Sequence, residues 1–119
     1  LDSERLAKKI FDEQKKQNKK IKLFIQINIG NEDQKSGIEV NNLKDFYSYC
    51  LNLNLEILGL MCIPPIDVDS SQSFKKMSQL NDDLNLQELS MGMSSDYLKA
   101  IDYESSYIRI GSSIFGERY

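Results

Sequence analysis

Two short turns hold the residues of this sequence that are best suited to binding an anion. The run GMSS at residues 92–95 leads into a predicted helix, whose free backbone N–H groups and dipole attract negative charge. The run GSS at residues 111–113 offers close backbone approach at the glycine and two hydroxyl donors. Together the turns predict a phosphate site. Taken singly, a serine before a helix is usually its N-cap, and a glycine after a strand is usually a turn.

A single arginine lies in the apolar run YIRI. In a strand, alternation places Arg109 on the same face as Tyr107 and opposite Ile108. Because a guanidinium keeps its charge, the sequence predicts that Arg109 points into an interior or over a ligand. A buried ion pair with Glu56 or another carboxylate is the alternative.

The composition excludes several kinds of chemistry within this sequence. There is no histidine, which excludes Ser-His-Asp and Cys-His catalysis. The two cysteines, Cys50 and Cys62, lack CxxC spacing, so structural zinc is not expected. A net charge of -3 and a pI near 5.0 disfavour nucleic acid as a partner, because phosphate backbones select basic surfaces. The lysine-rich residues 15–20 are expected at the solvated end of a helix.

The sequence also lacks the signals of membrane insertion and secretion. No apolar stretch approaches the ~20 residues that span a bilayer, and the polar, charged start does not resemble a signal peptide. We therefore expect no membrane partner and a cytoplasmic location, where the two cysteines stay reduced. The chain opens at Leu1 and enters a helix-like segment directly, which suggests a piece of a longer polypeptide.

The hydrophobic pattern predicts helices and strands in alternation. Strands are expected at residues 23–29 and 55–63, which are continuous apolar runs as in sheets buried on both faces, and shorter strands at residues 86–90 and 107–110. Helices are expected from a cap at Asp2 or Ser3, from a cap at Asn41 or Asn42 through Leu51, and at residues 71–84 and 96–103. This order predicts an α/β fold with a parallel sheet. It fits the C-terminal half of a (β/α)8 TIM-like barrel or a small open sheet, with residues 1–119 as one partial domain.

The two serine-containing turns follow the last two predicted strands. In (β/α)8 barrels a phosphate is commonly held between the loops after the last two strands, so the joint pattern is stronger than either turn alone. Half a barrel also leaves two open sheet edges. Oligomerisation through these exposed barrel edges is therefore an expected consequence.

Four runs of the sequence carry a resemblance to a known family. They are IQINIGNEDQKSGI, GLMCIPP, LSMGMSSDYLKAI and IRIGSSIFGERY, and together they cover nearly the whole chain. In order and spacing they resemble the C-terminal half of the pyridoxal-phosphate homeostasis proteins of the YggS/PROSC type, which are related to the alanine racemase N-terminal domain. The resemblance implies a single-domain (β/α)8 barrel that binds pyridoxal 5′-phosphate (PLP). It also implies a protein without established turnover that buffers or delivers this cofactor.

The resemblance assigns roles to five residues. Ser94, with Met93 beside it, resembles the phosphate-binding serine, and Gly111 with Ser112 resembles the other half of the phosphate cup. Ser112 stands where many relatives have threonine, and it keeps the hydroxyl. Arg109 resembles the arginine that faces the pyridine nitrogen. Its charge there disfavours protonation of that nitrogen, which weakens the cofactor as an electron sink and suits a carrier or a racemase-type site.

One part of the family pattern does not occur in this sequence. The lysine that holds the cofactor covalently in the family precedes the position of Leu1, and Lys35 does not match it. The chain is therefore expected to supply the phosphate half of the site and to bind PLP weakly or not at all by itself. Two alternatives stay open: a fragment of a PLP-dependent amino-acid racemase, and a cofactor-free structural half-barrel. Racemases carry a β-rich domain with a catalytic tyrosine after the barrel, and the sequence ends at Tyr119, which favours the non-enzymatic interpretation.

Overall fold

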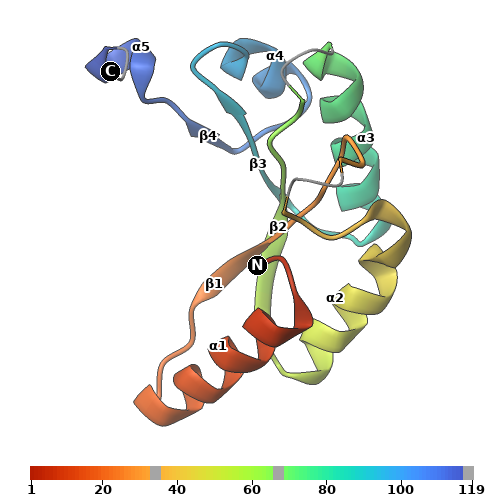
Figure 1. The fold of residues 1–119 in the computed structure, drawn as a ribbon, viewed down its shortest axis with the longest axis vertical. Helices are drawn as coiled ribbons and strands as arrows, with labels where there is room; N and C mark the ends of the chain where they lie inside the picture. Colours follow the sequence, from red (N-terminus) through yellow and green to blue (C-terminus); the bar gives the residue numbers. More distant parts are fainter. Residues whose placement is uncertain (33–35, 66–68, 117–119) are drawn as a thin grey trace.

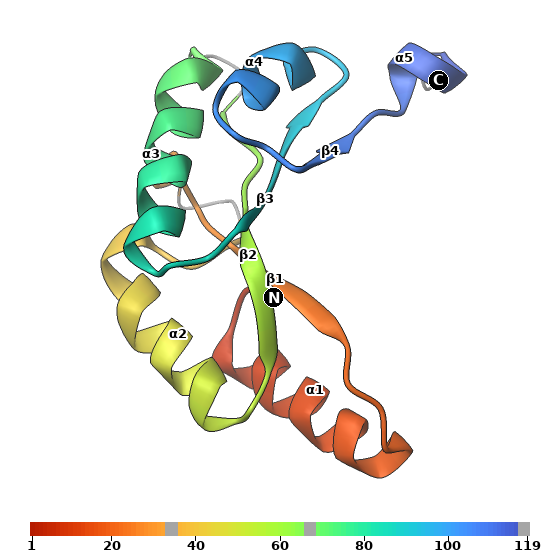
Figure 2. The same ribbon diagram turned by 180° about the vertical axis from the view of Figure 1, so that it is seen from behind.

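Four parallel strands form a curved sheet in the computed structural model, which describes residues 1–32, 36–65 and 69–116 (Figures 1 and 2). The strand order follows the chain, β1-β2-β3-β4, and every neighbouring pair is parallel. The strands are β1 (Lys22–Gln26), β2 (Glu56–Met61), β3 (Glu88–Met93) and β4 (Tyr107–Arg109). The helices are α1 (Glu4–Gln17), α2 (Leu43–Asn52), α3 (Ser70–Asp83), α4 (Tyr97–Asp102) and α5 (Ser112–Phe115), with a 3-10 turn η1 (Val40–Asn42) before α2. The predicted α/β class with alternating helices and parallel strands is confirmed.

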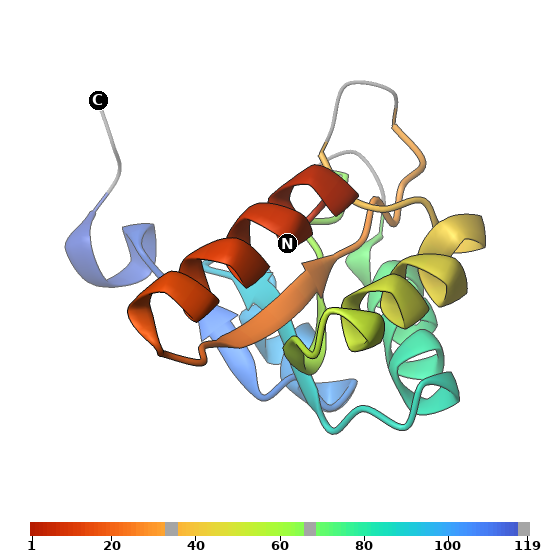
Figure 3. The ribbon, with the colours of Figure 1, turned by 90° about the horizontal axis from the view of Figure 1, so that it is seen from below.

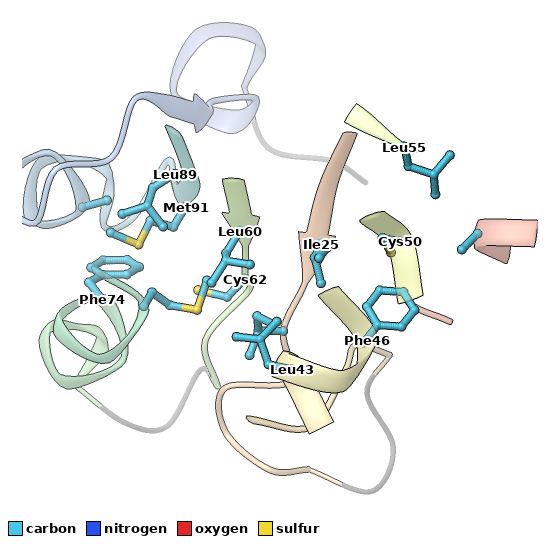
Figure 4. Packing of buried hydrophobic residues seen from close by; sticks show 14 residues of the cluster. Ile25, Leu43, Phe46, Cys50, Leu55, Leu60, Cys62, Phe74, Leu89 and Met91 are labelled. Atoms are coloured by element: carbon cyan, nitrogen blue, oxygen red, sulfur yellow. The ribbon is translucent and has the colours of Figure 1, made fainter. Parts of the chain in front are cut away.

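The hydrophobic core lies between the sheet and the helices. Leu60 on β2 and Met91 on β3 are fully buried together with Phe74 on α3 (Figure 4). Each such side chain stabilises the fold by roughly 1.5–3 kcal/mol relative to an exposed one. Leu51, which the periodicity of the second helix placed on the inward face, is instead 51% exposed. It lies at the last turn of α2, where the helix runs past the edge of the sheet.

The first helix begins as the sequence predicted. The Ser3 hydroxyl accepts a hydrogen bond from the backbone N–H of Leu6 and caps α1. Figure 3 shows α1 beside β1 at one edge of the sheet. There the Leu1 ammonium donates to the Phe24 carbonyl, and the Leu1 carbonyl accepts from Gln26. This pattern is that of a parallel strand pair.

No helix in the described part of the chain has both the length and the apolar composition needed to cross a bilayer.

The curvature of the sheet brings its two edge strands toward each other on the concave side. Phe24 on β1 contacts Tyr107 on β4 edge to face, with ring centroids 5.1 Å apart. Neighbouring strands of a sheet lie about 4.8 Å apart. Strands β1 and β4 are separated by two other strands, so their side chains can meet only if the sheet is curved. The described strands therefore have the bend of a barrel wall.

The third strand ends later than predicted. The sequence predicted a strand at residues 86–90 followed by a loop, whereas β3 runs to Met93. Gly92 has a φ of 104°, and the pairing of β3 with β4 shifts between Ser90 and Met93. This is a bulge, in which one extra residue is inserted on one strand. The glycine that the sequence analysis assigned to a turn is the residue that allows it.

Candidate functional site

The two turns that the sequence predicted to bind phosphate line one open cleft of about 1280 Å³ at the carboxyl ends of β3 and β4. Its remaining lining comes from α5 and its flanks and from Ser95, Ile108 and Ile110. Parallel α/β folds bind their ligands at this end of the sheet. The five residues that the sequence analysis selected all lie in this cleft: Met93, Ser94, Arg109, Gly111 and Ser112.

A hydrogen bond joins the two turns. The backbone N–H of Gly111 donates to the Ser94 hydroxyl oxygen at 3.2 Å. The turn after β3 and the turn after β4 thus meet in space although their residues are 17 positions apart in the sequence. The structure therefore brings the two halves of the predicted phosphate cup together.

Neither Ser94 nor Ser95 caps the helix that follows, so the prediction that they begin it is wrong. Helix α4 starts at Tyr97, and its N-cap position is Asp96. The Asp96 carboxylate accepts from the backbone N–H of Met93 at 2.8 Å, which closes a turn around the two serines. Side-chain-to-backbone bonds of this kind are typical of aspartate. The turn holds Ser94 outside the helix, where its hydroxyl reaches Gly111.

Gly92 and Gly111 are glycines for different reasons. A Cβ at Gly92 would lie 2.7 Å from the Cβ of Ala100, so this glycine permits α4 to pack against β3. A Cβ at Gly111 would meet no atom within 4 Å, and its φ is -120°, which any residue can adopt. Folding of the described residues does not require a glycine at position 111. The open space beside it belongs to the cleft, which favours close approach of a ligand to the backbone.

Arg109 is half-buried and reaches across the end of β3. Its Nη2 donates to the Cys62 carbonyl oxygen at 2.8 Å. Among the described residues it makes no ion pair with Glu56, the carboxylate that the sequence analysis named as its alternative partner. Its Nε and Nη1 are buried and have no hydrogen-bond partner within the described residues. An unpaired buried donor costs roughly 1–3 kcal/mol, so an acceptor that reached either nitrogen would stabilise the guanidinium.

Burial changes the acid–base properties of the groups near the cleft. It lowers the pKa of Arg109, while the Cys62 thiol and the Asp96 carboxylate act in the opposite direction. Burial also raises the pKa of Cys62 to about 12 and that of Cys50 to about 11. Both thiols are consequently protonated at neutral pH, and neither suits a nucleophile. The described residues contain no group of three or more acidic, histidine or cysteine side chains that could hold a metal ion.

The described residues fit a ligand that carries an anionic group and a separate hydrogen-bond acceptor. Ser94, Gly111 and Ser112 line the space suited to the anion, and Arg109 lines the same cleft. Lys35, Tyr119 and the Ser113 side chain lie outside the described residues. The sequence analysis missed Asp96 as the residue that closes the first turn. The signal was an aspartate directly after two serines, which was interpreted only as part of a helix start.

Comparisons with known proteins agree on one kind of protein. The family described as "Alanine racemase, N-terminal domain" matches residues 1–119. The pyridoxal phosphate homeostasis protein of Aquifex aeolicus is 40% identical, over 99% of this chain and 56% of the relative. The human protein of the same name is 34% identical, over 99% of this chain and 49% of the relative. The chain thus spans about half the length of the curated relatives that it matches.

A solved structure supports the same relationship. PipY of Synechococcus elongatus, solved with PLP bound, is 27% identical and superimposes with a TM-score of 0.87, covering 98% of this chain and 58% of PipY. The same protein without PLP gives a TM-score of 0.86 at 28% identity. The curved sheet described above therefore corresponds to about half of each of these larger folds.

Proposed function

The chain belongs to the alanine racemase N-terminal domain family, and from this membership we propose that it binds PLP in the cleft at the ends of β3 and β4. We propose further that the whole protein takes part in intracellular PLP homeostasis, as a non-catalytic carrier or buffer. In this proposal the present chain supplies the phosphate-binding half of the site. The names of the curated relatives and the cofactor bound to PipY support it.

The observation that carries the proposal is that Arg109, with two donor nitrogens that have no partner among the described residues, lines the same cleft as the joined turns. PLP has a phosphate at one end and a pyridine nitrogen, an acceptor when unprotonated, in its ring. Ser94 and Ser112 would hold the phosphate with their hydroxyls, and Gly111 would let it approach the backbone. Arg109 would donate to the ring nitrogen and satisfy a buried donor. Met93, which is 43% exposed, would pack beside the bound cofactor.

The charge of Arg109 favours a carrier over an enzyme that needs PLP as a strong electron sink. When bound in an enzyme, PLP supplies an electron sink that is strongest with a protonated ring nitrogen. A guanidinium beside that nitrogen disfavours its protonation, because like charges repel. Arg109 is fixed by the Cys62 carbonyl and would hold the nitrogen in its unprotonated form. This arrangement suits a carrier or a racemase-type site better than a site that needs the full electron sink, and the racemase alternative is tested separately.

The racemase alternative makes a different prediction for the full-length protein. An alanine racemase interconverts the two enantiomers of alanine and needs a second acid–base group, which the described part of the cleft does not offer. We expect incubation of the full-length protein with PLP and L-alanine to produce no D-alanine. Formation of D-alanine at a rate that depends on protein concentration would reverse the ranking of these two functions.

The chain is proposed to be one partial domain whose open face is covered by the rest of a barrel. Exposed apolar side chains gather on β4, α4 and α5, and the matched relatives are about twice as long as this chain. Large exposed apolar patches mark surfaces that contact other protein. A cofactor-free structural half-barrel, or pairing of two chains through these edges, would use the same surface. The exposed residues are Leu98, Ile101, Tyr107, Ile108, Ile114 and Phe115.

A cytoplasmic location, with no nucleic-acid or membrane partner, is part of the same proposal. Cys50 and Cys62 are both free thiols, which suits a reducing compartment. The net charge of -3 is unfavourable for binding to a phosphate backbone. Retention of the chain on DNA or on anionic lipid vesicles at physiological salt would contradict this part of the proposal.

The test of PLP binding is a set of serine substitutions in the full-length protein. Ser94→Ala and Ser112→Ala should each lower the affinity for PLP by about tenfold to a hundredfold, the value of one lost bond to a charged acceptor. Ser78→Ala is the matched control, because Ser78 bonds Glu104 on the surface, away from the cleft. Equilibrium dialysis with PLP measures all three. Affinities equal to that of the wild type for both cleft variants would mean that the serines serve the fold alone.

A further inference from the structure

The alignment of β4 against β3 depends on few backbone contacts. The two strands pair only at Ser90 with Tyr107 and at Met93 with Arg109, on either side of the bulge. The cleft nevertheless requires their ends to be aligned, because Gly111 must reach Ser94. Some other contact must therefore fix how far β4 extends beyond β3.

The Ser105 hydroxyl makes that contact. It donates to the Met91 carbonyl at 2.6 Å and accepts from the Met91 backbone N–H at 3.3 Å. It also lies 3.0 Å from the Tyr107 carbonyl on β4. The backbone N–H of Ser105 donates to the Ala100 carbonyl at the end of α4. One half-buried residue thus connects β3, β4 and α4 at the position directly before the bulge.

The neighbouring Ser106 makes similar bonds at a different place. Its hydroxyl accepts from the Leu89 backbone N–H at 2.9 Å, and its own N–H donates to the Leu89 carbonyl at 2.9 Å. Leu89 lies near the beginning of β3, on the far side of Met91 from the bulge. Removal of the Ser106 hydroxyl leaves a backbone bond in place and leaves the contact at Met91 intact. Both hydroxyls also contact the Leu89 carbonyl, at 3.3 Å from Ser105 and 3.2 Å from Ser106, and of the two serines Ser105 is the one that bonds Met91 at the bulge.

We infer that Ser105 is a positioning residue for the phosphate cup, which acts by fixing β4 against β3 at the bulge so that Gly111 meets Ser94. The inference rests on the proposed PLP function. Ser105 touches neither the cleft lining nor any group proposed to contact the cofactor. Its effect on binding is transmitted through Met91 on one strand and Tyr107 on the other. It should influence the phosphate end of a ligand more than the ring end, because the Arg109 side chain is also held by the Cys62 carbonyl.

The experiment compares Ser105→Ala with Ser106→Ala in the chain of 119 residues and in the full-length protein. The ligands are PLP and pyridoxal, which has the same ring without the phosphate, and the readouts are affinity and thermal unfolding. We expect Ser105→Ala to lower the affinity for PLP about tenfold and to change that for pyridoxal less than about twofold. The two substitutions should lower the unfolding temperature by similar amounts. Ser106→Ala should preserve the ratio of the affinity for PLP to the affinity for pyridoxal. The inference would be overturned if Ser105→Ala left the ratio of PLP affinity to pyridoxal affinity unchanged, or if both variants reduced this ratio equally.

A measurement without ligand separates this inference from the proposed function. In ¹H–¹⁵N NMR spectra, Ser105→Ala should shift the amide of Gly111 and speed its exchange with solvent, whereas Ser106→Ala should not. If the wild type binds no PLP, the proposed function fails and the Gly111 amide alone decides the inference. If Ser105→Ala does not fold, Ser105→Cys keeps the size of the side chain with a weak donor and carries the same expectations. A Gly111 amide identical in the wild type and both variants would refute the positioning role.

Discussion

Replacement of Gly111 by alanine should separate ligand binding from folding at the cleft. The structure places no atom within 4 Å of a Cβ at this position, and the φ of -120° is one that alanine adopts without strain. The new methyl group would lie in the space where we propose that the phosphate approaches the backbone. The substitution should leave the stability of the fold nearly unchanged and should weaken the binding of the ligand.

The magnitudes follow from three terms. Gly→Ala at a compatible backbone conformation stabilises a protein by about 0.4–1 kcal/mol, because it restricts the unfolded chain. Gly111 is also the N-cap of α5, where alanine is poorer than glycine by about 1 kcal/mol or less. These terms nearly cancel, so the free energy of unfolding should change by less than about 1 kcal/mol. An inserted methyl group in a filled space costs about 1–3 kcal/mol, which corresponds to a loss of PLP affinity of about fivefold to 150-fold.

The matched control is Gly92, the buried glycine that precedes the other serine turn. Gly92→Ala places a Cβ 2.7 Å from that of Ala100 and forces alanine to a φ of 104°, so it should destabilise the fold by more than about 1 kcal/mol. Thermal unfolding and PLP dialysis of both variants give the comparison. We expect normal unfolding with weak binding for Gly111→Ala and early unfolding for Gly92→Ala. A Gly111→Ala variant that folds and binds PLP as tightly as the wild type would refute the assignment of this turn to the phosphate.

Two further predictions concern Arg109 and the buried thiols. Arg109→Met removes two unpaired buried donors, so it should leave the unfolding temperature unchanged or raise it while lowering PLP affinity; a large loss of stability without loss of binding would contradict the proposed role. Cys62 and Cys50 have folded-state pKa values raised from 9.0 to about 12 and about 11, and a raised pKa stabilises the fold below the unfolded value. The free energy of unfolding should therefore fall as the pH rises above 9. This fall should be smaller in Cys62→Ala, measured by urea unfolding between pH 8 and 10.

The general fold could be predicted from the sequence because its strands are unusually apolar. Continuous apolar runs such as residues 23–29 and 55–63 predicted strands, and the helical period of α2 lies between them. The expectation that both faces are buried is not met among the described residues, because most of β1 and β2 is only partly buried. The strand ends were less predictable. The bulge at Gly92 depends on how closely Ala100 packs against it, which is a contact between two elements and has no local signature.

The candidate site shows the same division between local and tertiary information. Glycine and serine after two strands were sufficient to select Ser94 and Gly111, since parallel strands end at the same edge of a sheet. The hydrogen bond between them could not be predicted, because it depends on the turn that Asp96 closes and on the alignment of β4. Arg109 is half-buried, and its bond among the described residues is to the Cys62 backbone and not to a carboxylate. A carbonyl partner has no sequence signal, because every residue has one.

The contacts that shape the phosphate cup all lie within one consecutive part of the chain. Asp96 with Met93, Ser94 with Gly111, and Ser105 with Met91 join residues no more than 17 positions apart. Contacts between residues close in sequence cost little loop-closure entropy, so this cup can form together with β3, α4 and β4. The donors of Arg109 are different, because two of them have no partner among the described residues. The proposed anion cup is thus shaped by the protein's own hydrogen bonds, while the position proposed to face the ring of a ligand would be completed only by a bound acceptor.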